Sequence, residues 1–282
     1  MSEPPDAGCY YFSAMIKLEV ILTPAELPAL AKCELRETVC VVFDVLRATS
    51  TIVTALHNGA KAVVPVSEIA EALAIRKMQP DVLLGGERDG LKIRAAQSGG
   101  TDFDLGNSPR ECTPEKVSGR TIVSTTTNGT RALRACAGAK TVLAGSFLNL
   151  TATAEFIWRQ QFENVLLVCA GTHENCALED VLAAGALIEL LRVLGVECGD
   201  MSPLSKAPTC RRTPQFSDSA EIAYCAWAQA KADLAAAVCN SENARRLLGI
   251  PELSGDVPFC LQQDVFPLVA KLEADGIIRC KK

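Results

Sequence analysis

The sequence contains no apolar run long enough to cross a bilayer. The longest such segment, residues 181–191, is interrupted by Gly185 and Glu189, and it is far shorter than the roughly 20 residues that a spanning helix needs. The first 14 residues have neither a basic cluster nor a sustained apolar core, so we expect a loose tail there and no secretory signal. These absences favour a cytoplasmic location without membrane contact.

Basic clusters are also missing. The formal net charge is −5, and an acidic chain without a lysine- or arginine-rich block is not expected to bind nucleic acid. The 13 cysteines include no pair separated by two residues, which predicts reduced thiols that pack as small core residues. Cys169, His173 and Cys176 form a cluster of potential metal ligands, but a fourth zinc ligand is lacking, so we do not expect zinc.

Two common phosphate-handling motifs are absent as well. No GxxxxGK[ST] sequence occurs, which excludes a P-loop. The run at residues 43–46 contains Asp44 but lacks the second aspartate of haloacid-dehalogenase-type phosphatases. Any phosphatase activity must therefore use a different set of residues.

What the sequence does contain is typical of a globular α/β enzyme, with 49% apolar and 22% charged residues. Short β-branched runs alternate with amphipathic segments. This alternation predicts a layered α/β/α fold with a mixed, largely parallel sheet, built from strand–loop–helix units whose loops are rich in Thr or Gly. The length allows one catalytic region over residues 15–282 or two packed lobes, about 15–140 and 141–282.

We expect strands over residues 16–23, 38–43, 62–66, 82–86, 121–124, 141–145 and 165–170. We expect helices over residues 24–33, 49–58, 68–78, 152–160, 178–194, 219–238 and 242–248, and one more that ends at residue 136. The last third of the chain, from about residue 199, should cover the sheet rather than carry the main chemistry. Its residues 201–217 should form a surface connection.

The stretch Asp-Val-Leu-Arg-Ala-Thr-Ser-Thr at residues 44–51 is the strongest candidate for chemistry. It joins a buried strand to a helix start, and the carboxyl ends of parallel strands are where open α/β sheets bind ligands. Amides and hydroxyls at the helix start suit an anion, and Arg47 can add a bidentate clamp. The alternative is structural, with Asp44 merely capping the helix.

Four loops after predicted strands, at residues 44–51, 85–92, 125–131 and 171–180, can face one pocket. Their carboxylates can build the oxygen-rich, partly hydrated shell that Mg²⁺ prefers, and their arginines can neutralise charge during phosphoryl transfer. The carboxylates are Asp44, Glu87, Glu179 and Asp180, and the arginines are Arg47, Arg88 and Arg131.

Each of these residues also has a structural interpretation. Glu179 and Asp180 fall in the first turn of a helix, where the macrodipole favours acids anyway. Glu87 and Arg88 can form a surface ion pair, and residues 104–109 and 125–130 can be simple turns. His173 lies in a loop, where a solvent-facing side chain is expected more than a general acid.

Taken together, several motifs resemble the signature of the 2-phosphosulfolactate phosphatase family, in family order from about residue 16 onward. They are the stretch at residues 44–51, Gly-Glu-Arg at 86–88, Phe-Asp-Leu-Gly-Asn-Ser-Pro at 103–109, Thr-Thr-Asn-Gly-Thr-Arg at 126–131, Cys-Ala-Gly at 169–171, Leu-Glu-Asp at 178–180 and Ala-Gly at 184–185. The resemblance implies a Mg²⁺-dependent α/β hydrolase that converts 2-phospho-3-sulfolactate to 3-sulfolactate and phosphate.

The resemblance also suggests roles for the matching residues. Catalysis is assigned to Asp44, Arg47 and Asp180, and Mg²⁺ to Asp44 and Asp180 with Glu87 or Glu179. The expected substrate-binding residues are Arg47, Thr49, Ser50, Thr51, Arg88, Asn107, Ser108, Thr127, Asn128, Gly129, Thr130 and Arg131. A metal-activated water and a covalent aspartyl-phosphate on Asp44 remain open as routes.

Three other functions stay open at this point. They are a phosphatase of the same scaffold for another small phosphorylated 2-hydroxy acid, a non-catalytic anion-binding protein, and a metal-dependent lyase or isomerase. In each case the expected partner is a small anionic molecule. The oligomeric state is open, with a homodimer as one expectation.

Overall fold

The computed structural model describes residues 16–197 and 215–281. The predicted tail at residues 1–14 and most of the predicted connection at residues 201–217 lie outside these ranges. No described helix combines the length and apolar character that a membrane span requires.

The described strands form one 11-stranded sheet. The strands are β1 (Lys17–Ile21), β2 (Thr38–Phe43), β3 (Ala62–Pro65), β4 (Leu83–Arg88), β5 (Leu91–Lys92), β6 (Thr121–Thr125), β7 (Thr141–Gly145), β8 (Asn164–Cys169), β9 (Gln215–Phe216), β10 (Val269–Leu272) and β11 (Ile278–Lys281). Their order in the sheet is β5-β4-β6-β3-β11-β10-β7-β2-β8-β1-β9. The prediction of a mixed, largely parallel sheet is confirmed.

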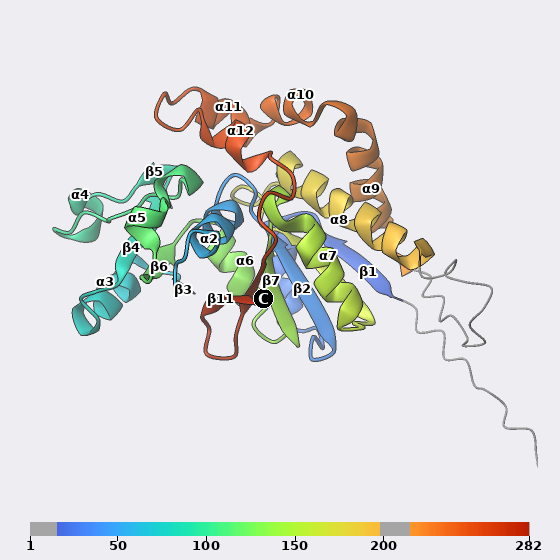
Figure 1. Ribbon diagram of the computed structural model, residues 1–282, viewed down its shortest axis with the longest axis horizontal. Coiled ribbons are helices and arrows are strands. Elements are labelled where there is room, and N and C mark those ends of the chain that lie inside the picture. Colours follow the sequence, from blue (N-terminus) through green and yellow to red (C-terminus); the bar gives the residue numbers. More distant parts are fainter. Residues whose placement is uncertain (1–15, 198–214, 282) are drawn as a thin grey trace, which may run out of the picture.

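Helices pack on both faces of this sheet (Figure 1). The described helices are α1 (Leu27–Leu30), α2 (Ala48–His57), α3 (Ile69–Met78), α4 (Ala95–Ser98), α5 (Pro114–Val117), α6 (Gly129–Ala135), α7 (Leu150–Arg159), α8 (Leu178–Glu197), α9 (Asp218–Ala230), α10 (Leu234–Cys239), α11 (Glu242–Leu248) and α12 (Asp256–Cys260). The segment between β4 and α5 contains β5, α4 and a short 3₁₀ turn.

Strand β2 shows why the fold has three layers. All six of its residues are buried, and alternate side chains of a strand point to opposite faces. Val39, Val41 and Phe43 pack with residues of α7 and α8, whereas Cys40 and Val42 pack with residues of α2 and α6. The continuous apolar run is therefore a strand covered by helices on both sides.

The sheet consists of two parallel blocks joined by a hairpin. Strands β9, β1, β8, β2 and β7 form one block, and β3, β6 and β4 form the other. The hairpin β10–β11 lies between them and pairs antiparallel on both sides, so the two blocks run in opposite senses. A single residue pair, Ile278 with Val63, joins β11 to β3.

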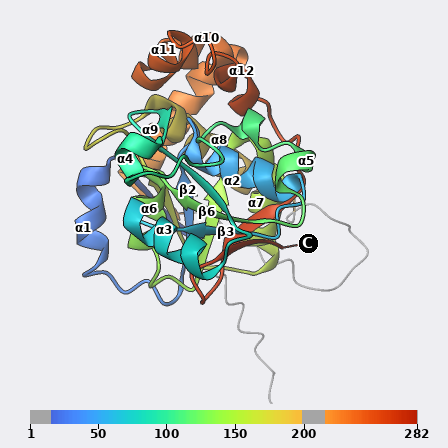
Figure 2. The same cartoon turned by 90° about the vertical axis from the view of Figure 1, so that its left-hand side faces the viewer.

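The expectation that the last third of the chain only covers the sheet is wrong. The hairpin β10–β11 occupies the middle of the sheet, because its antiparallel pairing satisfies the edges of both blocks. Helices α10, α11 and α12 form a cap above one edge of the sheet (Figures 1 and 2). Strand β2, from the predicted first lobe, pairs with β7 and β8 from the second, while the lobe boundary itself stays a prediction.

The contact between α8 and α9 depends on Gly185. A Cβ atom at this position would lie 2.2 Å from the carbonyl oxygen of Ala223 and 2.6 Å from the Cβ of Trp227. Both distances are shorter than van der Waals contact, and the two atoms are a backbone oxygen and a Cβ, which cannot move unless the backbone of α9 moves with them. Only glycine lets the two helices approach this closely.

We therefore expect Gly185→Ala to reduce the free energy of unfolding by about 1–3 kcal/mol, because the added methyl overpacks the interface. The matched control is Gly138→Ala, since a Cβ there meets no atom within 4 Å. The control should change stability by less than about 0.5 kcal/mol. Urea unfolding of both variants measures the difference, and equal stabilities would contradict this account of the interface.

Candidate active site

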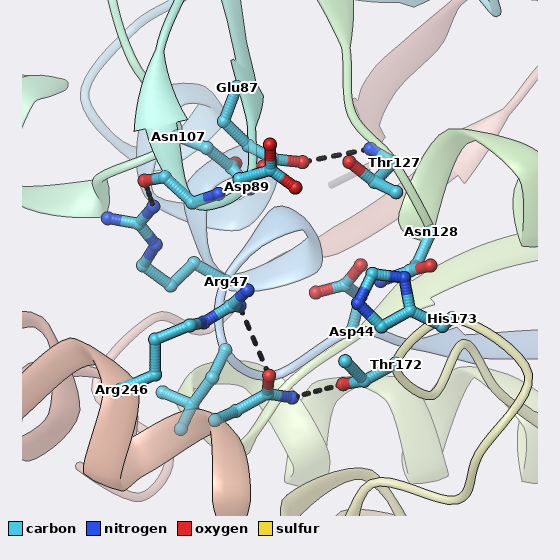
Figure 3. Close-up of a pocket in the computed structure, with 13 residues that line it drawn as sticks. Asp44, Arg47, Glu87, Asp89, Asn107, Thr127, Asn128, Thr172, His173 and Arg246 are labelled. Carbon is cyan, nitrogen blue, oxygen red and sulfur yellow. Dashed lines mark hydrogen bonds between the residues drawn. The ribbon is translucent and has the colours of Figure 1, made fainter.

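A polar pocket lies where loops from both blocks of the sheet meet the cap (Figure 3). Its lining residues are Asp44, Leu46, Arg47, Glu87, Asp89, Gly90, Asn107, Thr127, Asn128, Thr172, His173, Asn243 and Arg246. The loops after β2 and β8 come from one block, and those after β4 and β6 come from the other. The blocks run in opposite senses, and loops from both of them reach this pocket.

Asp44 both caps α2 and lines the pocket, so the structural and the functional interpretation of this residue both hold. Its Oδ1 accepts the backbone N–H of Ala48 at 3.0 Å, which caps the start of α2. Its own backbone N–H donates to Thr49 Oγ1 at 3.0 Å. The second carboxylate oxygen, Oδ2, accepts no hydrogen bond from the described chain, and Asp44 lines the pocket. One oxygen thus holds the loop and the other is available for chemistry.

Gly129, at the start of α6, makes room for this carboxylate. A Cβ at Gly129 would lie 2.7 Å from Asp44 Oδ2 and 2.6 Å from the Cβ of Ala48. The Thr-Asn-Gly-Thr loop therefore packs its backbone directly against Asp44, which explains why glycine stands there.

Burial sets the protonation behaviour of Asp44 and its neighbour Asp180. Desolvation raises the pKa of Asp44 to about 6, and the negative charges of Glu87 and Glu179 act in the same direction. Burial likewise raises the pKa of Asp180 well above its usual range, with the charge of Asp44 as the next cause. Perturbed carboxylates gathered at one pocket are a common mark of a catalytic site.

Asp180 connects two of the pocket loops. Its Oδ1 accepts the backbone N–H of Val45 at 2.8 Å, and its Oδ2 accepts that of Gly171 at 3.0 Å. Both oxygens are thus used to hold the loop after β2 against the loop after β8. Asp180 is buried behind the pocket and is absent from the lining, so the structure places it as a support for Asp44.

Glu87 plays the same part in the other block of the sheet. Its Oε1 accepts the backbone N–H of Thr127 at 2.8 Å, and its Oε2 accepts that of Gly90 at 2.7 Å. Glu87 is 7% exposed and lines the pocket. The surface ion pair considered for Glu87 and Arg88 does not form, since Arg88 donates instead to the Glu87 carbonyl and to Thr125.

Arg47 is fixed by a buried ion pair that the sequence did not indicate. Its Nη1 lies 2.7 Å from Asp256 Oδ2 on α12, and its Nη2 donates to the Gly90 carbonyl at 2.6 Å. Ser108 donates to the other oxygen of Asp256 at 2.6 Å. Arg47 lines the pocket, but Asp256 already balances its charge. The guanidinium that was predicted to clamp a bound anion is therefore paired with a carboxylate of the protein.

Several other predicted binding residues also use their polar groups inside the protein. The hydroxyl of Ser50 donates to the Val45 carbonyl, that of Thr51 to Asn107, and that of Thr130 to Thr126. Arg131 is half-exposed and pairs with Glu174 at 2.6 Å. The structure keeps Thr49, Ser50, Thr51, Arg88, Ser108, Gly129, Thr130 and Arg131 out of the pocket lining, while Asn107, Thr127 and Asn128 are part of it.

Three groups of pocket residues were missed or undervalued. Asp89 and Gly90 form a turn directly after β4, and an Asp-Gly pair after a predicted strand is a signal that could have singled them out. His173 is exposed, as expected, yet it also lines the pocket. Asn243 and Arg246 come from α11, and no local pattern marks them, because an ordinary amphipathic helix carries them.

The predicted metal shell of Asp44, Glu87, Glu179 and Asp180 is not assembled as a cage. Within residues 16–197 and 215–281, no group of three or more His, Cys, Asp or Glu side chains is arranged to hold a metal ion. Asp180 uses both oxygens on backbone amides, and Glu179 Oε1 accepts from Asn243 at 2.7 Å. The carboxylates that reach the pocket are Asp44, Glu87 and Asp89.

Comparison with known proteins shows where this site belongs. A family model described as 2-phosphosulpholactate phosphatase matches residues 22–275. A protein named "Probable 2-phosphosulfolactate phosphatase" from Caldanaerobacter subterraneus subsp. tengcongensis is 42% identical over 251 residues, which cover 87% of this chain and 92% of the relative. Proteins with the same name from Thermotoga petrophila and Clostridium acetobutylicum are 40% and 35% identical, over 86% and 84% of this chain and 92% and 90% of their own lengths. The chain therefore belongs to the 2-phosphosulfolactate phosphatase family of phosphoric monoester hydrolases.

Proposed function

We propose that this protein hydrolyses the phosphate ester of 2-phospho-3-sulfolactate, yielding 3-sulfolactate and phosphate, with Mg²⁺ as its cofactor. Membership in the family supports the reaction class. The observation that carries the proposal is the Asp44 carboxylate, which is buried and faces a polar pocket, with one oxygen that accepts no hydrogen bond from the described residues. Such an oxygen can contact a metal ion or a phosphorus atom.

The residues of the pocket fit Mg²⁺ by their chemistry. Proteins usually bind this ion through one or two carboxylates, with water and substrate phosphate completing the shell. Asp44, through its Oδ2, and Asp89 offer such a set, and Glu87 lies beside them with both oxygens on backbone amides. A further sign is Glu179 Oε2, which is buried without a hydrogen-bond partner in the described structure. When bound, Mg²⁺ would neutralise charge on the phosphoryl oxygens.

The protein's own groups supply binding and orientation. Asn107, Asn128 and Thr127 line the pocket with amide and hydroxyl groups that can hydrogen bond to phosphoryl oxygens. Asp180 and Glu87 hold the loops, so these groups stay in place during turnover. His173 also faces the pocket (Figure 3) and can deliver a proton to the oxygen that leaves with sulfolactate.

The first test is phosphate release from 2-phosphosulfolactate by the purified protein, with Mg²⁺ and with a chelator. We expect turnover only with the metal. Asp44→Asn should lower kcat by at least about 100-fold, because it removes the charge at the reacting centre. The control is Asp81→Asn, an exposed aspartate outside the pocket lining, which should retain full activity.

Two results would contradict the proposal. If no phosphate is released with Mg²⁺ present, the function would be hydrolysis of another phosphorylated 2-hydroxy acid or binding of an anion without turnover. Full activity of Asp44→Asn would show that Asp44 takes no part in the reaction.

The raised pKa of Asp44 predicts a stability change of defined sign. Below about pH 4 both the folded and the unfolded protein carry the protonated acid, so burial costs little there. Between pH 4 and about 6 the folded state holds the proton more tightly, so its stability falls as the pH rises, and the loss persists above pH 6. Asp44→Asn keeps the oxygen that caps α2 but lacks the charge.

Without divalent metal, we therefore expect Asp44→Asn to be more stable than the wild type by about 1–3 kcal/mol at pH 7.5, and to differ little at pH 4. Mg²⁺ should raise the unfolding temperature of the wild type but not that of Asp44→Asn. Thermal unfolding across this pH range measures both effects. A variant less stable than the wild type at pH 7.5 would show that burial of the charge is not the dominant cost.

A further inference from the structure

The cap contributes the second of two arginines that line the pocket. Arg47 and Arg246 both reach it (Figure 3). Arg47 is 3% exposed and is neutralised by Asp256, which is 0% exposed. A cation balanced by a buried carboxylate inside the protein has little charge to offer a ligand.

Arg246 differs because no carboxylate balances it. Its Nη2 donates to Asn243 Oδ1 at 3.2 Å, and no Asp or Glu of the described ranges lies within ion-pair distance of it. Its guanidinium carbon is 3.7 Å from the position that a Cβ on Gly90 would occupy, so the side chain reaches across from α11 to the loop after β4. Arg246 is thus a pocket cation whose counter-charge is missing from the described structure.

Asn243 holds Arg246 in this position. It lies one turn earlier on α11 and donates through Nδ2 to Thr172 Oγ1 at 2.6 Å and to Glu179 Oε1 at 2.7 Å. Its Oδ1 accepts from Arg246, so both ends of the amide are used. Asn243 is buried and ties α11 to the loop after β8.

The acids and Arg246 approach the pocket from different elements. Asp44, Glu87 and Asp89 come from the sheet edge, whereas Arg246 extends from the cap (Figure 3). A metal and a phosphoryl group suit the acidic side. A second anionic group on the same small molecule suits the guanidinium, which can bind a carboxylate or sulfonate through two hydrogen bonds.

We infer that Arg246 is a specificity-determining residue that binds a carboxylate or sulfonate of the substrate, away from the phosphate, and that Asn243 is its positioning residue. The inference deepens the proposed function and rests on it for the location of the phosphate. A purely structural role fits Arg246 poorly. Arg245, the other basic residue in the last turn of α11, donates to the Asn240 carbonyl at the end of α10 at 2.8 Å and is absent from the pocket lining. Arg246 instead reaches across to the loop after β4.

The kinetic test compares two phosphate esters. 2-Phosphosulfolactate carries a carboxylate and a sulfonate, and ethyl phosphate carries neither. In Arg246→Gln, we expect kcat/KM for 2-phosphosulfolactate to fall about 10- to 100-fold, mainly through KM, because an ionic hydrogen bond to the ground state is lost. Hydrolysis of ethyl phosphate should stay within about twofold of the wild type.

Arg245→Gln is the matched control, since it removes the same charge one position earlier on α11 and outside the pocket lining. Arg245→Gln should leave kcat/KM for both esters unchanged. Equal losses on both esters in Arg246→Gln would overturn the inference, because Arg246 would then act on the phosphate.

A binding experiment keeps the inference separate from the proposed reaction. Titration calorimetry of the full chain with Mg²⁺ measures lactate, 2-hydroxyethanesulfonate and inorganic phosphate in turn. Arg246→Gln should weaken the binding of lactate or of 2-hydroxyethanesulfonate by about tenfold and leave the binding of phosphate unchanged. The organic anion whose binding is weakened identifies the group that Arg246 holds. Unchanged affinity for both organic anions would overturn the inference, whether or not the protein hydrolyses 2-phosphosulfolactate.

Discussion

The buried carboxylate of Asp44 is the constraint on which the rest of the site depends. A buried ionised acid with other acids nearby is costly unless hydrogen bonds, a counter-ion or a proton compensate for it. The protein gives one oxygen of Asp44 to the start of α2 and leaves the other facing the pocket. Neighbouring acids raise its pKa further. The buried charge lowers the stability of the folded protein, and a bound cation can offset this cost. Such a loss of stability is common at functional sites.

The other buried acids act as connectors. Asp180 joins the loops after β2 and β8, Glu87 joins those after β4 and β6, and Asp256 joins α12 to Arg47 and Ser108. Each carboxylate takes two donors from segments that are far apart in the chain. Loops that would otherwise move independently are therefore fixed around Asp44. Most of the acidic residues that suggested a metal site in the sequence instead accept hydrogen bonds that fix the pocket loops.

The two sides of the pocket have opposite electrostatic character. The sheet edge carries the carboxylates of Asp44, Glu87 and Asp89, and the cap carries Arg246, which has no carboxylate of the described residues within ion-pair distance. In the proposed function, the first side would hold a metal and the phosphoryl group, and the second would hold another anion of the substrate. The division matches a small substrate with charges at both ends. Under the inference for Arg246, the cap would take a direct part in recognising the substrate.

The sequence by itself determined the local elements and the family. The run of β2 and the start of α2 follow from short-range apolar pattern and capping chemistry, which neighbouring residues decide. The motifs around Asp44, Glu87 and Asn128 identified the pocket loops for the same reason. Only the tertiary structure decided that β10 and β11 enter the middle of the sheet, that Asp256 neutralises Arg47, and that α11 lines the pocket. Those outcomes join segments separated by more than a hundred residues, and they depend on the order of the strands, which no local periodicity encodes.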